Sequence, residues 1–420
     1  MKLVKRIVRG VLRRGKKLYH KVVSPVQRKK YRKLYEECCK QPVEQNRVLF
    51  VDNRSSAFPD NMEAIKGELE KRGGFEMISL VRDMRQQPAS EQKKYIQEFM
   101  REFARAQYVY LVDYFAPLYM VKKRPETVVV QLWHACGAFK KWGYSVLDEG
   151  FGKTRQEVEK SPIHTNYSFA TVSSQQVAPN YAEAFNMLNR MEDVRATGVA
   201  RTDVFFRPEY IQEAREKFDS LFPQAQGKKV ILYAPTYRGS IKKPKTDLPI
   251  HIPFLSEKLG EEYVLAIKLH PFVPPEEYHI PEEYSGFAKN LSASMEINQL
   301  LCVADVCITD YSSIVFEYSL FEKPMIFYAY DKEEYIDYRG FYYPYEEFIP
   351  GPLVEDEQQL VEAILQTGEN WDPQVVKAFK EKFMDACDGH SSSRIVDETL
   401  GNVTLVGAAQ CCLDPSTYRE

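Results

Sequence analysis

The chain has 420 residues, of which 44% are hydrophobic, and its formal net charge at pH 7 is −2. This length exceeds what one hydrophobic core usually organises, and the composition is ordinary for a globular protein, so we expect two domains. No apolar run reaches the roughly 18 residues of a membrane-spanning helix, and no signal-peptide core follows Met1, so we expect the body to stay in the cytoplasm. The eight cysteines lack CxxC spacing, which argues against a zinc site or a secreted disulfide framework.

The first 40 residues are strongly basic, with fifteen Lys or Arg against two Glu. Their apolar residues recur in pairs about one helical turn apart, from Leu3 and Val4 onward, until Ser24-Pro25 interrupts the pattern. This predicts an amphipathic helix with one apolar and one Lys/Arg-rich face. Such a helix suits the surface of an anionic membrane, and we expect peripheral attachment to the inner leaflet through residues 1–30.

Two alternatives exist for this basic segment. Nucleic acid also attracts polybasic stretches, but the apolar stripe would have no role on a duplex, so we expect no nucleic-acid partner. A helix that belongs to the core and keeps a solvated basic face is the structural alternative.

Short apolar runs alternate with helical stretches, such as residues 91–106, over most of the remaining chain. Predicted strands cover residues 48–51, 75–80, 108–112, 128–132 and 169–172, then 230–233, 264–267, 306–308 and 325–327. This alternation predicts βαβ units, and thus an α/β protein with two Rossmann-like domains that face each other across a cleft. No Gly-x-Gly-x-x-Gly pattern follows the first strand, which disfavours a nicotinamide enzyme.

The predicted domain organisation has four parts. These are a basic membrane-association segment (1–40), an N-terminal Rossmann-like domain (41–206), a C-terminal Rossmann-like domain (207–400) and a tail (401–420). Helices are predicted at 355–366 and 374–387, whereas residues 401–420 carry no readable motif and are expected to form a strand and tail or to be disordered.

Two histidines stand at the carboxyl ends of predicted strands. His134 follows the apolar run 128–133, and His270 follows the run 263–269. Ligands of open α/β sheets bind at this edge, so the two positions indicate a shared cleft. A histidine that is merely satisfied by a backbone carbonyl is the alternative for either position.

A hydroxyl-rich turn stands at the same kind of edge. Residues 309–313 read Thr-Asp-Tyr-Ser-Ser between an apolar strand and an amphipathic helix. Free backbone N–H groups and the helix dipole favour an anion there, and Ser312 and Ser313 can add hydroxyl donors. The alternative is that Asp310 or Ser312 only caps the helix.

Five segments in order resemble the motifs of the CDP-glycerol glycerophosphotransferase family, which includes teichoic acid primases and polymerases. They are residues 131–143 (QLWHACGAFKKWG), 197–203 (TGVARTD), 233–238 (YAPTYR), 268–271 (KLHP) and 309–313 (TDYSS). The resemblance implies the GT-B arrangement and a membrane-peripheral transferase that moves glycerol phosphate from CDP-glycerol to a lipid-linked acceptor, with CMP leaving. The motifs fit CDP-ribitol as the donor equally well. They also do not distinguish an enzyme that adds one unit from a polymerase.

This resemblance gives roles to the polar residues at the strand ends. His134, in the acceptor-side domain, is the expected base, and His270 the expected anion stabiliser, although the two roles could be reversed. Arg238 and the turn of Thr309, Asp310, Ser312 and Ser313 would hold the diphosphate, with Asp310 orienting the loop. In many members a Gly-Thr-Pro-like turn directly follows the first histidine, whereas here Ala135 and Cys136 come before Gly137, which leaves the acceptor open.

Further positions carry weaker predictions. Lys140 and Lys141 would approach donor phosphates or an anionic acceptor, or form an exposed basic turn. Glu317 would accept hydrogen bonds from donor hydroxyls, or lie on a solvated helix face. Arg201 and Asp203 would order the cleft near the domain hinge.

We expect neither a metal nor any other cofactor, because no Asp-x-Asp strand end and no His/carboxylate cluster of ligand spacing occurs in the sequence. Two other functions remain open from the sequence. One is a nucleotide-sugar glycosyltransferase of the same fold, and the other is a non-catalytic scaffold that binds lipid-linked intermediates.

Overall fold

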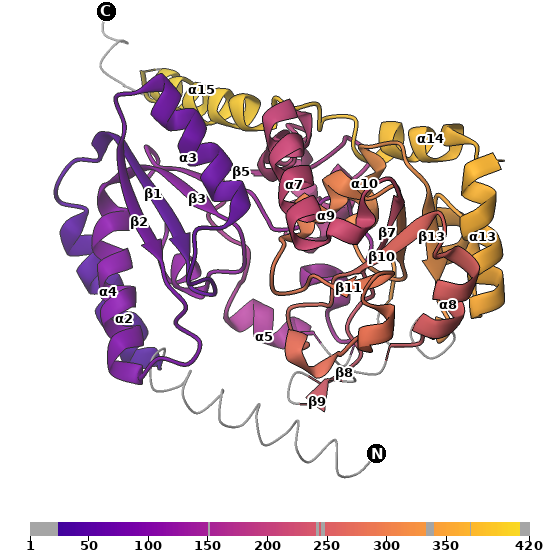
Figure 1. The fold of residues 1–420 in the computed structure, drawn as a ribbon. Coiled ribbons are helices and arrows are strands. Elements are labelled where there is room, and N and C mark those ends of the chain that lie inside the picture. The colour runs from indigo at the N-terminus through magenta and orange to yellow at the C-terminus, as the bar shows by residue number, and fades with distance from the viewer. Residues whose placement is uncertain are drawn as a thin grey trace, which may run out of the picture.

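The computed structural model describes residues 24–149, 152–240, 243–244, 248–332, 340–369 and 371–411. The basic amphipathic helix predicted at the start of the chain falls mainly on residues 1–23, which lie outside the described residues. Figure 1 shows two α/β units side by side, with the last helices of the chain running along one side of both.

The sheet of the first unit has six parallel strands in the order β2-β1-β3-β4-β5-β6. Their bounds are β1 Glu44–Asp52, β2 Glu76–Val81, β3 Ala106–Leu111, β4 Val128–Gln131, β5 Phe169–Thr171 and β6 Val194–Arg195. Each of the five strands predicted here overlaps an observed one. The runs in β1 and β4 are buried on both faces, as expected for a parallel sheet covered by helices.

Helices cover both faces of this sheet. The helices of this unit are α2 Pro25–Cys38, α3 Asp60–Arg72, α4 Ala89–Arg105, α5 Arg155–Lys160 and α6 Ala178–Ala184. Along β1, Val48 and Phe50 pack with α3, whereas Leu49 and Val51 belong to the core that includes α4, because successive side chains of a strand point to opposite faces.

Helix α2 belongs to this packed unit. Ser24 accepts a hydrogen bond from the backbone N–H of Gln27 at the start of the helix, and Tyr31 and Tyr35 are buried. The ring of Tyr35 stacks on Phe103 of α4, with 5.4 Å between the ring centroids. Residues 25–38, which we assigned to the membrane-association segment, therefore fold with the first domain.

The second unit repeats the architecture with the strand order β11-β10-β7-β12-β13-β14, all parallel. Its strands are β7 Lys229–Tyr233, β10 Tyr263–Ile267, β11 Ala288–Asn290, β12 Val306–Thr309, β13 Met325–Tyr328 and β14 Leu353–Val354, with a small hairpin of β8 Gly239–Ser240 and β9 Lys243–Pro244. Its helices are α7 Pro208–Leu221, α8 Ile252–Leu259, α9 Ile297–Val303, α10 Ile314–Ser319, α12 Tyr345–Phe348 and α13 Glu357–Glu369. The α/β class with two parallel-sheet domains is thus confirmed.

The last two helices, α14 Pro373–Phe383 and α15 Ser391–Cys411, bring the chain back to the first unit. Helix α15 contacts α3, β4 and the 3-10 helix η4 Ala200–Phe206, and Ile395 and Val396 join the apolar core of the first sheet. The buried Asp203 accepts hydrogen bonds from the backbone N–H groups of Ser391 and Ser392 at 2.9 and 2.8 Å. The expectation of a strand or disorder from residue 401 is wrong as far as Cys411, because α15 continues to that residue.

A loop of each unit crosses to the other. The backbone N–H of Lys141 donates to the carbonyl of Gly340 at 3.2 Å, and that of Tyr342 donates to Phe139 at 3.0 Å. Gly137 lies so close to α10 that an added Cβ would be 2.1 Å from the ring of Phe316. The segment after His134 is therefore fixed against the second unit.

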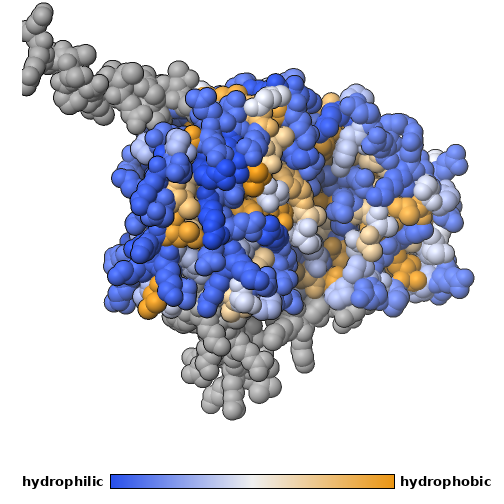
Figure 2. Space-filling model, turned by 90° about the vertical axis from the view of Figure 1, so that its left-hand side faces the viewer, coloured by the Kyte–Doolittle hydropathy of each residue, from blue (hydrophilic) through white to orange (hydrophobic). Residues whose placement is uncertain are grey.

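The molecular surface is mostly hydrophilic on the face drawn in Figure 2, where smaller apolar areas interrupt the polar ones. Among the residues that the structure describes, no helix combines the length and the apolar character that crossing a membrane would require.

Candidate active site

His134 follows the carboxyl end of β4 on a sharply turned backbone. Trp133 before it has φ +58°, a left-handed conformation that costs a bulky residue about 1–3 kcal/mol. The turn is held by Gln131, whose side-chain oxygen accepts from the backbone N–H of Trp133 at 2.9 Å. The indole stacks on Trp142 at 4.2 Å between ring centroids and lies 4.3 Å from the imidazole of His134.

The hydrogen bond of His134 fixes which ring nitrogen is free. Its Nδ1 lies 3.2 Å from the carbonyl oxygen of Val112. A carbonyl can only accept, so Nδ1 carries the proton and Nε2 of the neutral ring keeps its lone pair. Asp113 Oδ2 is 3.9 Å from the same Nδ1, close enough to stabilise the ring when it becomes protonated.

Charges around His134 act in both directions on its pKa. Desolvation is the main cause of a lowered pKa, and the positive charges of Arg201 and Arg54 act in the same direction. The carboxylate of Asp113 raises the pKa and offsets part of this effect. The imidazole side chain is still 53% exposed, so a ligand can reach it.

A hollow of about 150 Å³ opens beside His134, at the ends of β1, β3 and β4. It is lined by polar residues that the sequence analysis did not single out: Asp52, Arg54, Ser55, Asp60, Asn61 and Asp113. The available signal was the run Asp52-Asn-Arg-Ser-Ser after the predicted strand 48–51, where we noted only that the glycine pattern of a nicotinamide site is missing.

His270 stands three residues after the end of β10, and its Nδ1 accepts a hydrogen bond where that of His134 donates one. Its Nδ1 accepts from the backbone N–H of Phe272 at 3.2 Å, so in the neutral ring Nε2 carries the proton. The ring lies 5.6 Å from that of Tyr237 and 4.8 Å from that of Phe272 between centroids. Burial lowers the pKa of His270, and the positive charge of Lys140, from the first unit, lowers it further.

Arg238 lines the same small pocket as His270 but is already bound to two carboxylates. Its guanidinium donates to Asp331 at 2.6 and 2.9 Å and to Asp310 at 2.9 Å, with the rings of Tyr311 and Tyr330 at 5.2 and 5.6 Å. Burial alone would lower its pKa, but the bond to Asp331 and the charge of Asp310 outweigh burial and raise it. Arg238 therefore organises the loops around the turn, with much of its charge compensated.

The hydroxyl-rich turn lies between β12 and α10. The hydroxyl of Thr309 donates to the carbonyl of Ala234 at 2.8 Å. Asp310 is buried and accepts from the backbone N–H of Thr236 at 2.8 Å, so it orients the loop and does not cap the helix. Among the described residues, the Ser312 hydroxyl makes one long contact, accepting from the N–H of Ile314 at 3.4 Å, and Ser313 makes no side-chain capping bond. Both serines are half-buried, which leaves their hydroxyls available to a ligand.

Glu317 does not lie on the solvated helix face that was one of its two sequence-based expectations. Its side chain is only 4% exposed, so the solvated helix face is wrong, and its Oε1 binds the guanidinium of Arg201 from the first unit. Burial would lower the pKa of Arg201, but the charge of Glu317 raises it. Arg201 also donates its backbone N–H to Asn61 at 2.8 Å. This ion pair links the surroundings of His134 to the helix that follows the hydroxyl turn.

Lys140 and Lys141 lie on the loop that crosses to the second unit. Lys140 forms an isolated antiparallel bridge with Phe341, and Lys141 is exposed. The charge of Lys140 acts on His270, so it faces the second unit, whereas the contact made by Lys141 is through its backbone.

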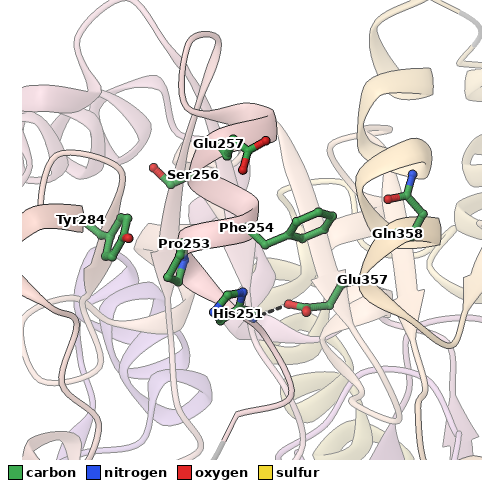
Figure 3. A pocket seen from close by; sticks show the side chains of 8 residues that line it. All are labelled: His251, Pro253, Phe254, Ser256, Glu257, Tyr284, Glu357 and Gln358. Carbon is green, nitrogen blue, oxygen red and sulfur yellow. Dashed lines mark hydrogen bonds between the residues drawn. The ribbon is translucent and has the colours of Figure 1, made fainter.

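A separate open hollow of about 720 Å³ lies between the starts of α8 and α13 (Figure 3). The backbone N–H of His251 donates there to the carboxylate of Glu357, which thereby occupies the start of α8. None of the residues assigned to the site from sequence lines it. In the described part of the chain no group of three or more His, Cys, Asp or Glu is placed to hold a metal ion.

Two parallel-sheet units, each with polar residues at the carboxyl ends of its strands, give the chain a GT-B-like α/β fold. The family model described as CDP-Glycerol:Poly(glycerophosphate) glycerophosphotransferase matches residues 34–401, and the chain belongs to this family of teichoic acid primases and polymerases.

Curated relatives of this family come from several bacteria. The chain is 36% identical over 360 residues to a teichoic acid ribitol-phosphate primase of Bacillus spizizenii, covering 85% of this chain and 91% of the primase. It is 37% identical to a poly(ribitol-phosphate) polymerase of the same organism, of which it spans only 57%. A glycerol-phosphate primase of Bacillus subtilis is 32% identical over 68% of this chain and 71% of the primase.

Solved structures show the same fold. The wall teichoic acid polymerase TagF superposes with a TM-score of 0.72 at 21% identity, over 96% of this chain and 97% of that chain. A TagF variant soaked with CDPG matches with a TM-score of 0.67. A UDP-GlcNAc 2-epimerase from Neisseria meningitidis matches more distantly, with a TM-score of 0.54 at 15% identity.

Proposed function

We propose that the protein transfers a polyol phosphate from a CDP-linked polyol to a hydroxyl of a lipid-linked glycan or polymer, with release of CMP. The observation that carries this proposal is the opposite bonding of the two histidines. Nδ1 of His134 faces a carbonyl acceptor, whereas Nδ1 of His270 faces an N–H donor. The neutral rings therefore offer a lone pair at one Nε2 and a proton at the other.

His134 is the base in this proposal. The acceptor oxygen attacks the polyol-linked phosphorus, the bond between that phosphorus and the bridging oxygen of CMP breaks, and the hydroxyl proton passes to Nε2 of His134. The lowered pKa of His134 keeps the ring neutral near pH 7, as a base requires. Asp113 is placed to stabilise the imidazolium that forms.

His270 and the turn before α10 act on the anion. Nε2–H of His270 and the hydroxyls of Ser312 and Ser313 are donors for the diphosphate as negative charge moves to the leaving CMP. The charge of Lys140, which acts on His270, adds to this positive region. Arg238 supports the turn through Asp310 and is not itself the main phosphate ligand.

CDP-ribitol is the donor that we favour, and CDP-glycerol is the second candidate. The support is that the ribitol-phosphate primase and polymerase are 36% and 37% identical over 85% and 86% of this chain, against 32% over 68% for the glycerol-phosphate primase. The two donors differ in their number of hydroxyls, which changes how many hydrogen bonds a site can make with them.

Attachment to the cytoplasmic face of the membrane through residues 1–30 is also part of the proposal. Its support is the excess of Lys and Arg in this segment. A variant lacking residues 1–23, which leaves helix α2 and its start at Ser24 in place, should lose most of its binding to vesicles of phosphatidylglycerol and keep its CMP release in detergent. Equal sedimentation of the two proteins with such vesicles would contradict the attachment.

The test of the enzyme activity is CMP release from CDP-ribitol or CDP-glycerol with a lipid-linked disaccharide acceptor. His134→Ala and His270→Ala should each lower kcat/KM by about 10² to 10⁴, the range for a positioned acid–base group. His251→Ala, in the separate hollow of Figure 3, is the matched control and should leave the rate unchanged. Product length on the same gel distinguishes the addition of one unit from polymerisation. If neither CDP-ribitol nor CDP-glycerol gives CMP, the proposal is refuted.

A further inference from the structure

The hollow beside His134 contains an acceptor atom to which none of the residues described by the structure donates a hydrogen bond. Asp52, the last residue of β1, is 4% exposed and lines this hollow. Its Oδ1 accepts from the backbone N–H of Arg54 at 3.2 Å, whereas its Oδ2 is buried and has no hydrogen-bond partner. An ionised oxygen left unpaired in the interior costs several kcal/mol, so such an atom indicates a ligand that donates to it.

The neighbours of Asp52 restrict the chemistry of that ligand. Arg54 is half exposed and donates to Asp113 at 2.8 Å, on the same side as His134. A guanidinium at the rim favours a phosphate, whereas carboxylates inside the hollow favour hydroxyl donors. A ligand that carries both groups is a polyol phosphate. A bare metal ion fits poorly, because Arg54 places a positive charge beside the carboxylates.

The hollow is held in shape by contacts within the first unit and by one contact from the second unit. Asn61, which is buried, donates to the carbonyl of Trp133 at 3.0 Å and accepts from Arg201. Asp60 accepts from Asn298 of α9 at 3.2 Å. The position of the wall relative to the imidazole is thus fixed from both sides, as a subsite next to a base requires.

We propose that this hollow binds the terminal polyol phosphate unit of the acceptor, with Asp52 and Asp113 accepting from its hydroxyls and Arg54 contacting its phosphate. The inference rests on the proposed function, because His134 is taken as the base that removes a proton from one of these hydroxyls. It goes beyond that function by naming the residues that select a hydroxyl-rich, phosphate-bearing acceptor.

Binding can be measured without turnover. Trp133 lines the hollow, so a titration with ribitol 5-phosphate or glycerol 3-phosphate is followed by tryptophan fluorescence. Asp52→Asn keeps an oxygen for the N–H of Arg54 but loses the charge, and should weaken binding about 10- to 100-fold, as expected for one hydrogen bond to a charged group. Asp83→Asn is the control, because Asp83 follows β2, pairs with Arg85 and does not line the hollow.

Turnover separates this inference from the proposed function. With a lipid-linked acceptor that ends in a polyol phosphate unit, Asp52→Asn should raise the acceptor KM by a similar factor and leave the donor KM unchanged. If no CMP forms from either donor but the phosphates bind in an Asp52-dependent way, the proposed reaction fails and the subsite stands. Three results would overturn the subsite: unchanged binding in Asp52→Asn, an effect on the donor KM alone, or a fluorescence change with Mg²⁺ alone that Asp52→Asn abolishes.

Discussion

Removing the charge of Glu317 should destabilise the protein, because Glu317 is the buried partner of Arg201 from the other unit. The two side chains are 4% and 20% exposed, so Glu317→Gln leaves a largely buried guanidinium without its counter-charge. Breaking a buried ion pair on one side costs about 3–5 kcal/mol. The partial exposure of Arg201 lets some water compensate, so we expect about 3 kcal/mol, at the lower end of that range.

The measurement is the free energy of unfolding in urea, followed by circular dichroism. Arg201→Met combined with Glu317→Gln removes both charges, so its loss should be smaller than the sum of the single losses by about 1–3 kcal/mol. Glu98→Gln is the control, because the pair of Arg82 and Glu98 is 49% and 41% exposed and such pairs contribute only about 0–1 kcal/mol. Additive single losses, or a loss in Glu317→Gln no larger than in Glu98→Gln, would refute the reasoning.

Three further predictions concern pH, packing and metal. Because desolvation lowers the pKa of His134, the neutral imidazole persists below about pH 6.5, the ordinary pKa of histidine. The acid limb of kcat/KM should therefore lie below that pH. Asp113 raises this pKa, so Asp113→Asn should move the limb to still lower pH; a shift to higher pH would contradict the electrostatic assignment. Gly137 has φ +58° and lies against an aromatic ring, so Gly137→Ala should cost about 1–3 kcal/mol of unfolding free energy. Gly67 has open space around it, so Gly67→Ala should cost nothing. Equal melting temperatures of the two variants would contradict the close contact at Gly137. CMP release should persist in EDTA, and loss of activity that Mg²⁺ restores would show that a metal is required.

Local patterns predicted the fold and the strand ends that carry the histidines. Buried parallel strands give continuous apolar runs, which is why the runs before His134 and His270 could be assigned as strands, with the histidines at their carboxyl ends. The turn at residues 309–313 was also placed correctly between β12 and α10. Alternation of this kind depends on neighbours in sequence, and a single chain shows it directly.

Pairings between distant residues could not be predicted in the same way. Arg201 and Glu317 are 116 positions apart, and nothing near Glu317 distinguishes a buried partner from a solvated helical residue. The hydrogen-bond pattern of each histidine depends on loop backbone at Val112 and Phe272, so the sequence left their roles reversible. Helix α15, Ser391–Cys411, was not predicted, because its residues lack a clear amphipathic stripe.

Because α15 packs on the first unit, the first unit cannot complete its fold until the end of the chain has been synthesised. Val48 and Phe50 of β1 share an apolar core with Ile395 and Val396. The carboxylate of Asp203 accepts a hydrogen bond from the backbone N–H of Ser391. A nascent chain usually folds its N-terminal domain as soon as it emerges. Here the half that is translated first lacks part of its apolar core until nearly 400 residues have been made, so its packing can be completed only late in synthesis.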